Sequence, residues 1–262
     1  MTTALTPAKS LALDMAKQEK AIEASLPEGL SVKKFMRTAV NAITTHSQAD
    51  KLLKADRKSL FTACQKAASD GLIIDGKEAT LTVFSGEVVY MPMTQGLVKL
   101  ARNSGEIGNI IAEVVYENDD FVYRPGIDDQ PQHSPDWFGQ RGAPIGAYAV
   151  VSVTGGEKIA VVMPKARIMA IAKGGKNIGQ YDPVKGAHFA EWWRKTVIKN
   201  VLKYAPKSTE LERALASDNE HIDPSKIPSS YEAPPAPSDD INNDLGVAEK
   251  VHEGQLVDTD II

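Results

Sequence analysis

The spacing of hydrophobic residues changes close to Gly76 in this 262-residue chain. Before that point, apolar residues recur every three or four positions, which predicts helices. After it, they alternate with polar residues, which predicts strands. A chain with helices first and alternating strands afterwards is expected to form an α+β fold.

Three helices are predicted in the first part of the chain. Ser31 and Asp56 are good N-caps, because their side chains can accept a backbone N–H of the first helical turn. Asp70-Gly71 is a typical helix end. The three helical segments span residues 7–25, 32–43 and 57–69.

Two β-hairpins are predicted after Gly76. Their turns are Ser85-Gly86 and Thr154-Gly155-Gly156, where glycine permits a tight backbone. Two more strands, joined by an acidic turn, and two short helices are also predicted. The hairpin strands span 79–84, 88–92, 145–153 and 158–163, the other strands span 107–116 and 121–124, and the helices span 94–104 and 164–172. The proline-rich segment 126–142 is predicted to be a loop.

A long amphipathic helix is predicted from Phe189 to Pro206. Lys195, Lys199 and Lys203 share one face because they stand four residues apart, and Trp192 lies on the same stripe. The other face is apolar and must pack on a core; it holds Phe189, Trp193, Val197, Val201 and Tyr204. Cations beside a large ring suit a sugar-phosphate backbone with unstacked bases. A buried helix with solvated lysines explains this segment, taken alone, equally well.

Charge is distributed unevenly along the chain. Thirty Lys and Arg against 34 Asp and Glu give a net charge of −4. Residues 158–203 nevertheless hold ten basic and two acidic residues, whereas residues 204–262 hold four basic and thirteen acidic residues. This asymmetry indicates polyanion binding with a separate interaction tail. From Ser217 the chain is rich in Pro, Ser, Asp and Asn and cannot bury a core, so residues 217–262 are predicted to be disordered.

Several classes of protein are excluded. The single cysteine, Cys64, permits no disulfide framework, which fits a reducing cytosol. The first twenty residues carry charges throughout and lack the apolar run of a signal peptide. No apolar run approaches the roughly 20 residues of a membrane span. We therefore expect a soluble, intracellular protein.

No convincing catalytic constellation is found. Residues 71–77 fit a phosphate-binding loop, but Glu78 follows where Ser or Thr is needed. His133 and Asp136 lie close enough in sequence to share a metal, and a polar loop is the favoured interpretation. The sequence predicts a binding protein that is not an enzyme and requires no cofactor.

Three blocks of sequence carry a resemblance to a known family. They are GLIIDGKEATLTVFSGEVVYMPMTQGLVKLARNSGEI (71–107), DDQPQHSPDWFGQRG (128–142) and WWRKTVIKNVLKYAP (192–206). Their content and order resemble the RecT family of phage and prophage single-strand annealing proteins, over about residues 31–215. The chain departs from the family pattern at residues 181–186, where many members have Gly-Pro-Trp, and at Met163-Pro164-Lys165, where a Ser or Thr helix start is expected.

The resemblance implies a protein that binds single-stranded DNA and anneals complementary strands without ATP, in phage-type homologous recombination. It implies an antiparallel hairpin sheet backed by a long basic helix. It also implies coating of DNA as a ring or helical filament, with subunit contacts through the N-terminal helices. The expected organisation is an N-terminal helical arm at 1–30, a DNA-binding and annealing core at 31–216, and an acidic tail for partner interaction at 217–262.

The same resemblance implies partners and a location. The partners are single-stranded DNA and the annealed duplex intermediate, further copies of the chain, a 5′–3′ exonuclease and the host single-strand-binding protein. Magnesium is a candidate modulator of DNA binding. The location implied is the cytoplasm of a bacterial host.

A basic groove between the second hairpin and the long helix is expected to hold the DNA, because phosphate contacts leave the base edges free. Tyr90 fits core packing and DNA contact equally well, whereas Trp193 is assigned to the core. Arg194 lies within the apolar face, where it either pairs with an acid or points into the groove, and the resemblance favours the groove. The candidate DNA-binding residues are Tyr90, Lys99, Arg102, Lys158, Lys165, Arg167, Lys173, Lys176, Trp192, Arg194, Lys195, Lys199 and Lys203.

Two other functions stay open at this point. One is a single-strand-binding protein without annealing activity. The other is a metal-dependent nuclease built on Glu113, Glu117, Asp119 and Asp120, for which a charged hairpin tip is the favoured alternative explanation.

Overall fold

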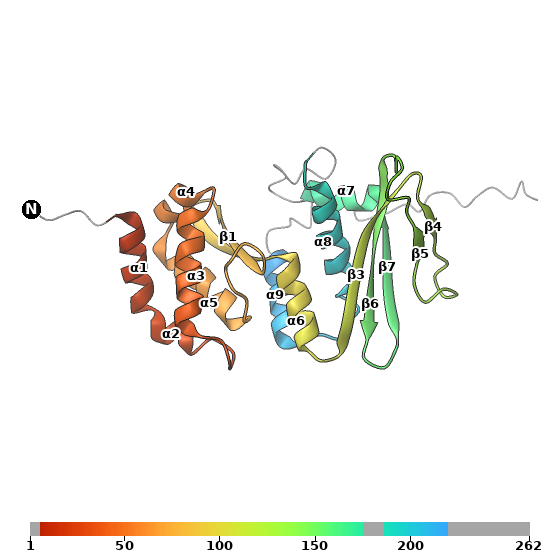
Figure 1. Ribbon diagram of the computed structural model, residues 1–262. Helices are drawn as coiled ribbons and strands as arrows, with labels where there is room; N and C mark the ends of the chain where they lie inside the picture. Colours follow the sequence, from red (N-terminus) through yellow and green to blue (C-terminus); the bar gives the residue numbers. More distant parts are fainter. Residues whose placement is uncertain (1–5, 175–185, 220–262) are drawn as a thin grey trace, which may run out of the picture. The chain divides into compact units, whose positions relative to one another are not determined.

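The computed structural model describes residues 6–174 and 186–219 (Figure 1). All of them belong to the first of the two units into which contacts divide the chain, 1–228 and 229–262. Lys176 and the predicted tail from residue 220 onward lie outside the described residues. The described part combines helices with antiparallel sheets, so the predicted α+β class is confirmed. None of its helices is long and apolar enough to cross a membrane.

The N-terminal part is helical, as predicted. Its helices are α1 (Pro7–Lys17), α2 (Glu19–Glu23), α3 (Val32–Thr45), α4 (Ala49–Lys54) and α5 (Arg57–Ser69). Both expected caps are present: Ser31 Oγ accepts the Lys34 N–H at 3.4 Å and Asp56 Oδ2 accepts the Ser59 N–H at 2.7 Å. The predicted first helix is divided at Gln18, and α4 was not predicted.

The first predicted hairpin is formed by β1 (Ala79–Phe84) and β2 (Glu87–Pro92). Its turn requires left-handed backbone at Ser85 (φ 51°) and Gly86 (φ 85°), which is typical of a tight two-residue connection. The hairpin packs on α5 through β2. Tyr90 of β2 is 2% exposed, and its hydroxyl donates to Asp70 Oδ2 at 3.1 Å.

The first turn of helix α6 (Thr94–Asn103) packs very closely against the backbone just before β1. A Cβ placed on Gly96 would lie 2.1 Å from the main-chain oxygen of Glu78. That oxygen also accepts the Met93 N–H at 2.9 Å. Only glycine permits this approach, because a side chain there would displace backbone.

A three-stranded antiparallel sheet forms the second half of the core. Its order is β3–β6–β7, built from β3 (Ile107–Tyr116), β6 (Pro144–Val153) and β7 (Lys158–Pro164). Helix α8 (Phe189–Val201) packs along all three strands, beside α7 (Lys165–Gly174) (Figure 1). Trp193, Val197 and Val201 of α8 are fully buried. The predicted hairpin sheet backed by a long helix is therefore present.

The pairing of two short strands differs from the sequence-based prediction. β4 (Asp120–Val122) pairs with β5 (Gln132–Ser134), which lies in the segment predicted to be a loop. Within the described structure β3 does not pair with β4, so the expected hairpin tip at residues 117–120 is wrong. The reason is long-range: β3 pairs with β6, and Phe121 of β4 packs against Tyr148 and Val150 of β6 instead.

The last helix extends past the predicted end of the core, and the long basic helix is shorter than predicted. α8 ends at Val201, and α9 (Thr209–Asn219) continues past the expected end at residue 216. Ser217 and Asp218 were assigned to the tail, but they are buried, at 9% and 7% exposure. The boundary moves because Asp218 has partners on α8 that composition does not reveal.

Candidate nucleic-acid interface

The lysine stripe of α8 faces another helix. Lys195 Nζ donates to Asp218 Oδ1 of α9 at 2.9 Å and to the main-chain oxygen of Pro92 at 2.9 Å. Lys199 forms an ion pair with Asp218 Oδ2. The two lysine side chains are 17% and 12% exposed, and the carboxylate is 6% exposed. The stripe therefore joins α8 to α9, and only Lys203 is exposed among its three lysines.

Burial and pairing act in opposite directions on these charges. Burial lowers the pKa of the Lys199 ammonium group, and the nearby Asp218 offsets this only in part. Burial by itself raises the pKa of the Asp218 carboxyl, but Lys195 and Lys199 outweigh it and hold that pKa below its usual range. A buried carboxylate between two buried ammonium groups is a structural clamp, because removing the Asp218 carboxylate leaves both lysines buried without their ion-pair partner.

Other candidate cations are also paired. Arg194 donates to Glu113 Oε2 at 3.0 Å and to Glu191 Oε1 at 2.6 Å. Lys99 donates to Glu78 Oε2 at 2.7 Å and to the main-chain oxygen of Gly71 at 3.0 Å. Both side chains therefore have acidic partners within the fold, and of the two interpretations of Arg194 the structure shows pairing with an acid.

Three further candidates lie in different surroundings. Arg102 is exposed, and its guanidinium donates to the Asn109 side chain at 3.2 Å. Trp192 is partly buried and packs against the core, next to the fully buried Trp193. Tyr90 lies in the core, bonded to Asp70, where it does not meet solvent. Of the two interpretations of Tyr90, the structure shows core packing.

A set of candidates on β7 and α7 forms no ion pair with any described acidic side chain. Residues 158–173 contain no Asp or Glu at all. Ile168 and Ala172 of α7 are buried, which turns Arg167 and Lys173 outward, and both are exposed. We name as the β7–α7 strip the four residues Lys158, Lys165, Arg167 and Lys173. No ion pair of the strip occurs within residues 6–174 and 186–219; Lys158 donates to the neutral Gln130 side chain at 3.0 Å.

An exposed aromatic residue near the end of α8 was missed by the sequence analysis. Tyr204 was placed on the apolar, buried face of the long helix, but it is 67% exposed. The helix ends at Val201, so the helical spacing no longer governs the direction of Tyr204. Lys203 and Lys207 are exposed on either side of it. The signal in the sequence was the helix-ending Pro206 two residues later.

Of the acids considered for a nuclease site, Asp119 belongs to a structural cluster with Arg141 and His133. The Asp119 side chain is fully buried and accepts two hydrogen bonds from Arg141, at 2.8 and 2.6 Å. His133 Nε2 lies 3.0 Å from the same carboxylate. The hydrogen bonds from Arg141 hold the pKa of the Asp119 carboxyl far below its usual range. Within the described residues no three His, Cys, Asp or Glu side chains are grouped so as to hold a metal ion.

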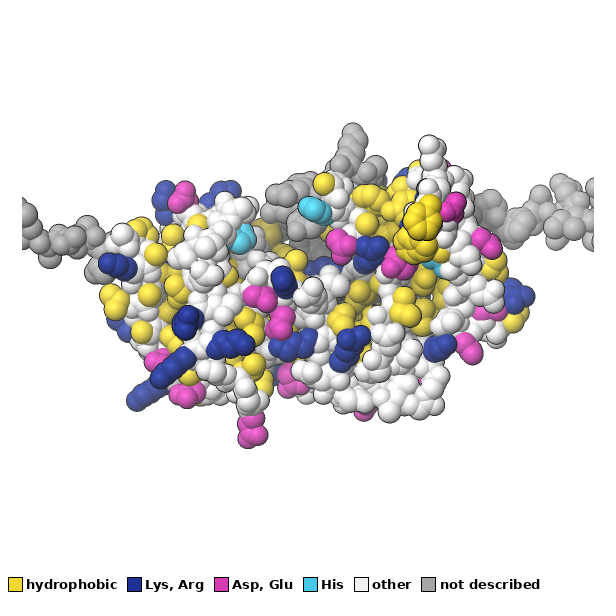
Figure 2. Space-filling view, viewed as in Figure 1, with side chains coloured by type: hydrophobic (Ala, Val, Ile, Leu, Met, Phe, Trp, Pro, Cys, Tyr) yellow, Lys and Arg dark blue, Asp and Glu magenta, His cyan; other side chains and the backbone are white. Residues whose placement is uncertain are grey.

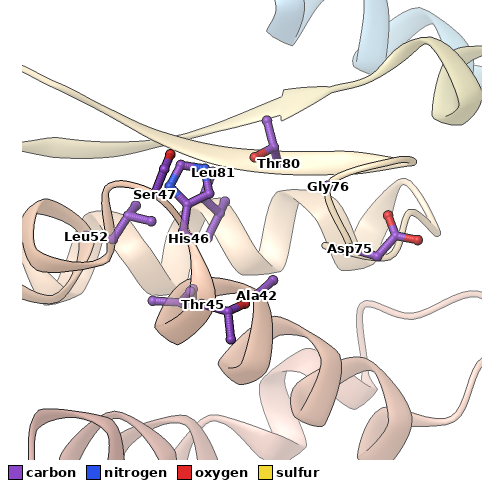
Figure 3. Close-up of a pocket in the computed structure, with 10 residues that line it drawn as sticks. Ala42, Thr45, His46, Ser47, Leu52, Asp75, Gly76, Thr80 and Leu81 are labelled. Atoms are coloured by element: carbon purple, nitrogen blue, oxygen red, sulfur yellow. The ribbon is translucent and has the colours of Figure 1, made fainter.

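A hollow of about 280 Å³ lies in the N-terminal part, between α3, α4 and β1 (Figure 3). His46 and Asp75 are its titratable lining residues, and Figure 3 shows them at opposite ends, with Asp75 pointing outward. His46 Nδ1 accepts the Gln48 N–H at 3.0 Å, and Asp75 Oδ1 accepts the Lys77 and Glu78 N–H groups at 2.8 Å each. Each group is used in a local turn, so the hollow holds no acid–base pair.

The fold and the strip together define the class of this protein. It is an α+β protein with an antiparallel sheet, a helix packed on that sheet, and a set of cations that form no ion pair within the described residues. The family model described as RecT family matches residues 33–232, and the chain belongs to that family. It is 34% identical over 137 residues to Protein RecT of Escherichia coli (strain K12). That match covers 50% of this chain and 48% of the E. coli protein, so the chain spans about half the length of the curated relative it matches.

Proposed function

We propose that this protein binds single-stranded DNA and anneals complementary strands without ATP, in phage-type homologous recombination. The observation that carries the proposal is the β7–α7 strip, whose four cations lie in a stretch of sixteen residues, 158–173, that contains no acid. Membership of the RecT family supports the same activity.

The chemistry of the strip suits annealing. Lys and Arg side chains bind phosphates without reading the sequence. A strand held by its phosphates keeps its base edges free, and free edges are what a complementary strand must reach. We also assign Lys203, Tyr204 and Lys207 to DNA binding, because they are exposed and the Tyr204 ring is a surface on which a base can stack. Such a stack is worth about 1–3 kcal/mol.

The proposal departs from the sequence-based expectation for two lysines of α8. Lys195 and Lys199 were expected in the groove, but they hold α9 through Asp218. We therefore assign phosphate binding to the β7–α7 strip and Lys203, and a structural role to Lys195 and Lys199. Lys176 stays a candidate because it follows the strip in sequence.

The finer parts of the proposal rest on the family. The protein coats DNA as an oligomer and works with a 5′–3′ exonuclease and the host single-strand-binding protein, in the bacterial cytoplasm. The acidic segment after α9 is repelled by DNA, which suits it to hold a protein partner. No cofactor is required, and magnesium acts by screening phosphates.

The first experiment is annealing of two complementary labelled oligonucleotides, without ATP, with and without magnesium. Faster pairing with intact strands is the expected result. Binding without faster pairing would indicate a protein that coats single strands but does not anneal them. Degraded strands would indicate a nuclease.

The second experiment tests the strip itself. Arg167→Ala with Lys173→Ala should weaken single-strand binding for every sequence. It should also reduce the slope of log K against log salt by about 1.4, because each phosphate contact on a single strand contributes about 0.7. The matched control is Lys54→Ala with Lys58→Ala, two exposed lysines on α4 and α5. An equal loss in the control, or an unchanged salt slope in the strip variant, contradicts the assignment.

A further inference from the structure

Two large aromatic side chains stand exposed on a loop that is otherwise well held. In the loop 135–142, which we call the aromatic loop, Trp137 is 64% exposed and Phe138 is 102% exposed. Asp136 Oδ1 accepts the backbone N–H groups of Phe138 and Gly139, both at 3.0 Å. Exposed rings on an ordered turn indicate an interaction site, because burying these apolar rings against a partner would be favourable.

The loop is braced from below by a buried ion pair. The Arg141 guanidinium lies 4.8 Å from the centre of the Trp137 ring and 4.3 Å from that of Tyr116. The same guanidinium is fixed by its two hydrogen bonds to the fully buried Asp119. The Trp137 ring is therefore held in place before any partner arrives, which lowers the entropy lost on binding. Figure 2 shows hydrophobic side chains gathered over this part of the molecule.

Charge around the aromatic loop is negative. Residues 117–141 contain six acidic and two basic residues. Both arginines are paired, Arg124 with Asp128 and Arg141 with Asp119. Four exposed acids have no ion pair in the described part of the chain, namely Glu117, Asp120, Asp129 and Asp136. Such a surface repels phosphates, so its aromatic rings do not suit a DNA strand.

A surface of opposite charge lies on α3. Lys33, Lys34 and Arg37 are exposed, and no ion pair to them occurs in the described ranges. Two of these cations stand in the first helical turn, which contains no acid. Cations at a helix N-terminus oppose the helix dipole, so they weaken α3 in the isolated chain. We call these three residues the basic face of α3.

The two surfaces are complementary in chemistry. Carboxylates pair with Lys and Arg, and the exposed faces of Trp and Phe rings attract the same cations. We propose that the aromatic loop of one copy of the chain docks on the basic face of α3 of the next copy. Because the two patches differ, the contact is heterologous and repeats from copy to copy, giving a ring or an open polymer.

The inference rests on the proposed coating of DNA by an oligomer, and its test is independent of annealing. Variant one carries Trp137→Ser and Phe138→Ser, and variant two carries Lys33→Glu, Lys34→Glu and Arg37→Glu. Sedimentation velocity of the full chain, with and without a short oligonucleotide, should show wild-type oligomers. Each variant alone should be a monomer at concentrations where the wild type associates.

Mixing the two variants gives the sharper result. Each retains the patch that the other lacks, so an equimolar mixture should form dimers and nothing larger. Variant one should also shorten wild-type oligomers, because it adds to one end and blocks the next addition. Ile127→Ser is the matched control, since Ile127 is 74% exposed in the same acidic region but outside the aromatic loop. It should associate as the wild type does.

Other outcomes overturn the inference. They are a wild type that is monomeric with and without DNA, variants that associate as the wild type does, or a mixture that stays monomeric while circular dichroism shows both variants folded. Weaker oligonucleotide binding by variant one at concentrations where every form is a monomer would instead assign the aromatic loop to DNA. Failure of the proposed function is separate, because annealing by the wild type is measured without either variant.

Discussion

At the scale of the residue, Gly96 shows how one atom determines the packing of two elements. It stands in the first turn of α6, against the main-chain oxygen of Glu78. The approach joins α6 to the segment that leads into β1. The sequence offers only a glycine near a helix start, which by itself is a weak helix former.

Gly96→Ala is expected to destabilise the protein by about 3 kcal/mol, at the upper end of overpacking costs, because the obstructing atom is backbone and cannot rotate away. Urea unfolding followed by circular dichroism measures the change. Gly108→Ala is the control, since a Cβ there would lie 3.7 Å from the Ser152 oxygen, an ordinary contact. Equal stability of the two variants would show that α6 can shift at little cost.

At the scale of the element, β3, β4 and β5 are joined by the Asp119 cluster. One carboxylate binds Arg141, His133 and the Tyr116 N–H, which come from three separate segments. In the sequence, Asp119 stands among acidic neighbours in one predicted turn. The tertiary fold separates them, because Asp119 points inward to Arg141 while Glu117 and Asp120 stay exposed.

The cluster predicts a pH dependence with a definite sign. Because the pKa of Asp119 is lower in the folded chain than its unfolded value of about 3.9, its stabilisation is present above that value and is lost as the pH falls below it. Asp119→Asn should cost about 3 kcal/mol near pH 7, and the difference from wild type should shrink between pH 4 and pH 2. Urea unfolding at several pH values measures this.

The matched control for the pH experiment is Asp129→Asn, which removes an exposed carboxylate from the same region. It should leave the stability near that of the wild type at each pH. A constant difference between Asp119→Asn and wild type across the acidic range would mean that the carboxyl does not titrate abnormally.

At the scale of the whole molecule, α9 belongs to the fold over its whole length, to Asn219. Asp218 is the partner of both buried lysines of α8, so α9 belongs to the core. Arg213 adds a second attachment, through its bond to Asp70 at 3.2 Å. A boundary drawn from composition at residue 216 separates Asp218 from the lysines it neutralises.

Two truncations test this boundary. A chain ending after Ser217 lacks Asp218 and should lose about 3 kcal/mol of stability, because Lys195 and Lys199 stay buried without their carboxylate. A chain ending after Asn219 should unfold as the full chain does and should still anneal oligonucleotides. Thermal unfolding compares the two. If the chain ending after Asn219 loses annealing, the acidic segment takes part in DNA pairing rather than in partner binding.

The sequence alone determined the α+β class, both hairpins, the helix caps at Ser31 and Asp56, and the family. These depend on local periodicity, on turn chemistry and on the order of segments along the chain, all of which can be read between near neighbours. The sequence also showed that a basic segment, 158–203, precedes an acidic one, 204–262.

Tertiary structure alone decided which charges are available. Lys195 and Arg167 look equivalent in sequence, yet one is clamped by Asp218, 23 residues away, and the other is exposed. The same holds for Tyr90, which is bonded to Asp70 in the core, and for Trp137, which is exposed above Arg141. The physical reason is that the availability of a charge or ring depends on partners brought near by folding, and helical or strand spacing contains no information about them.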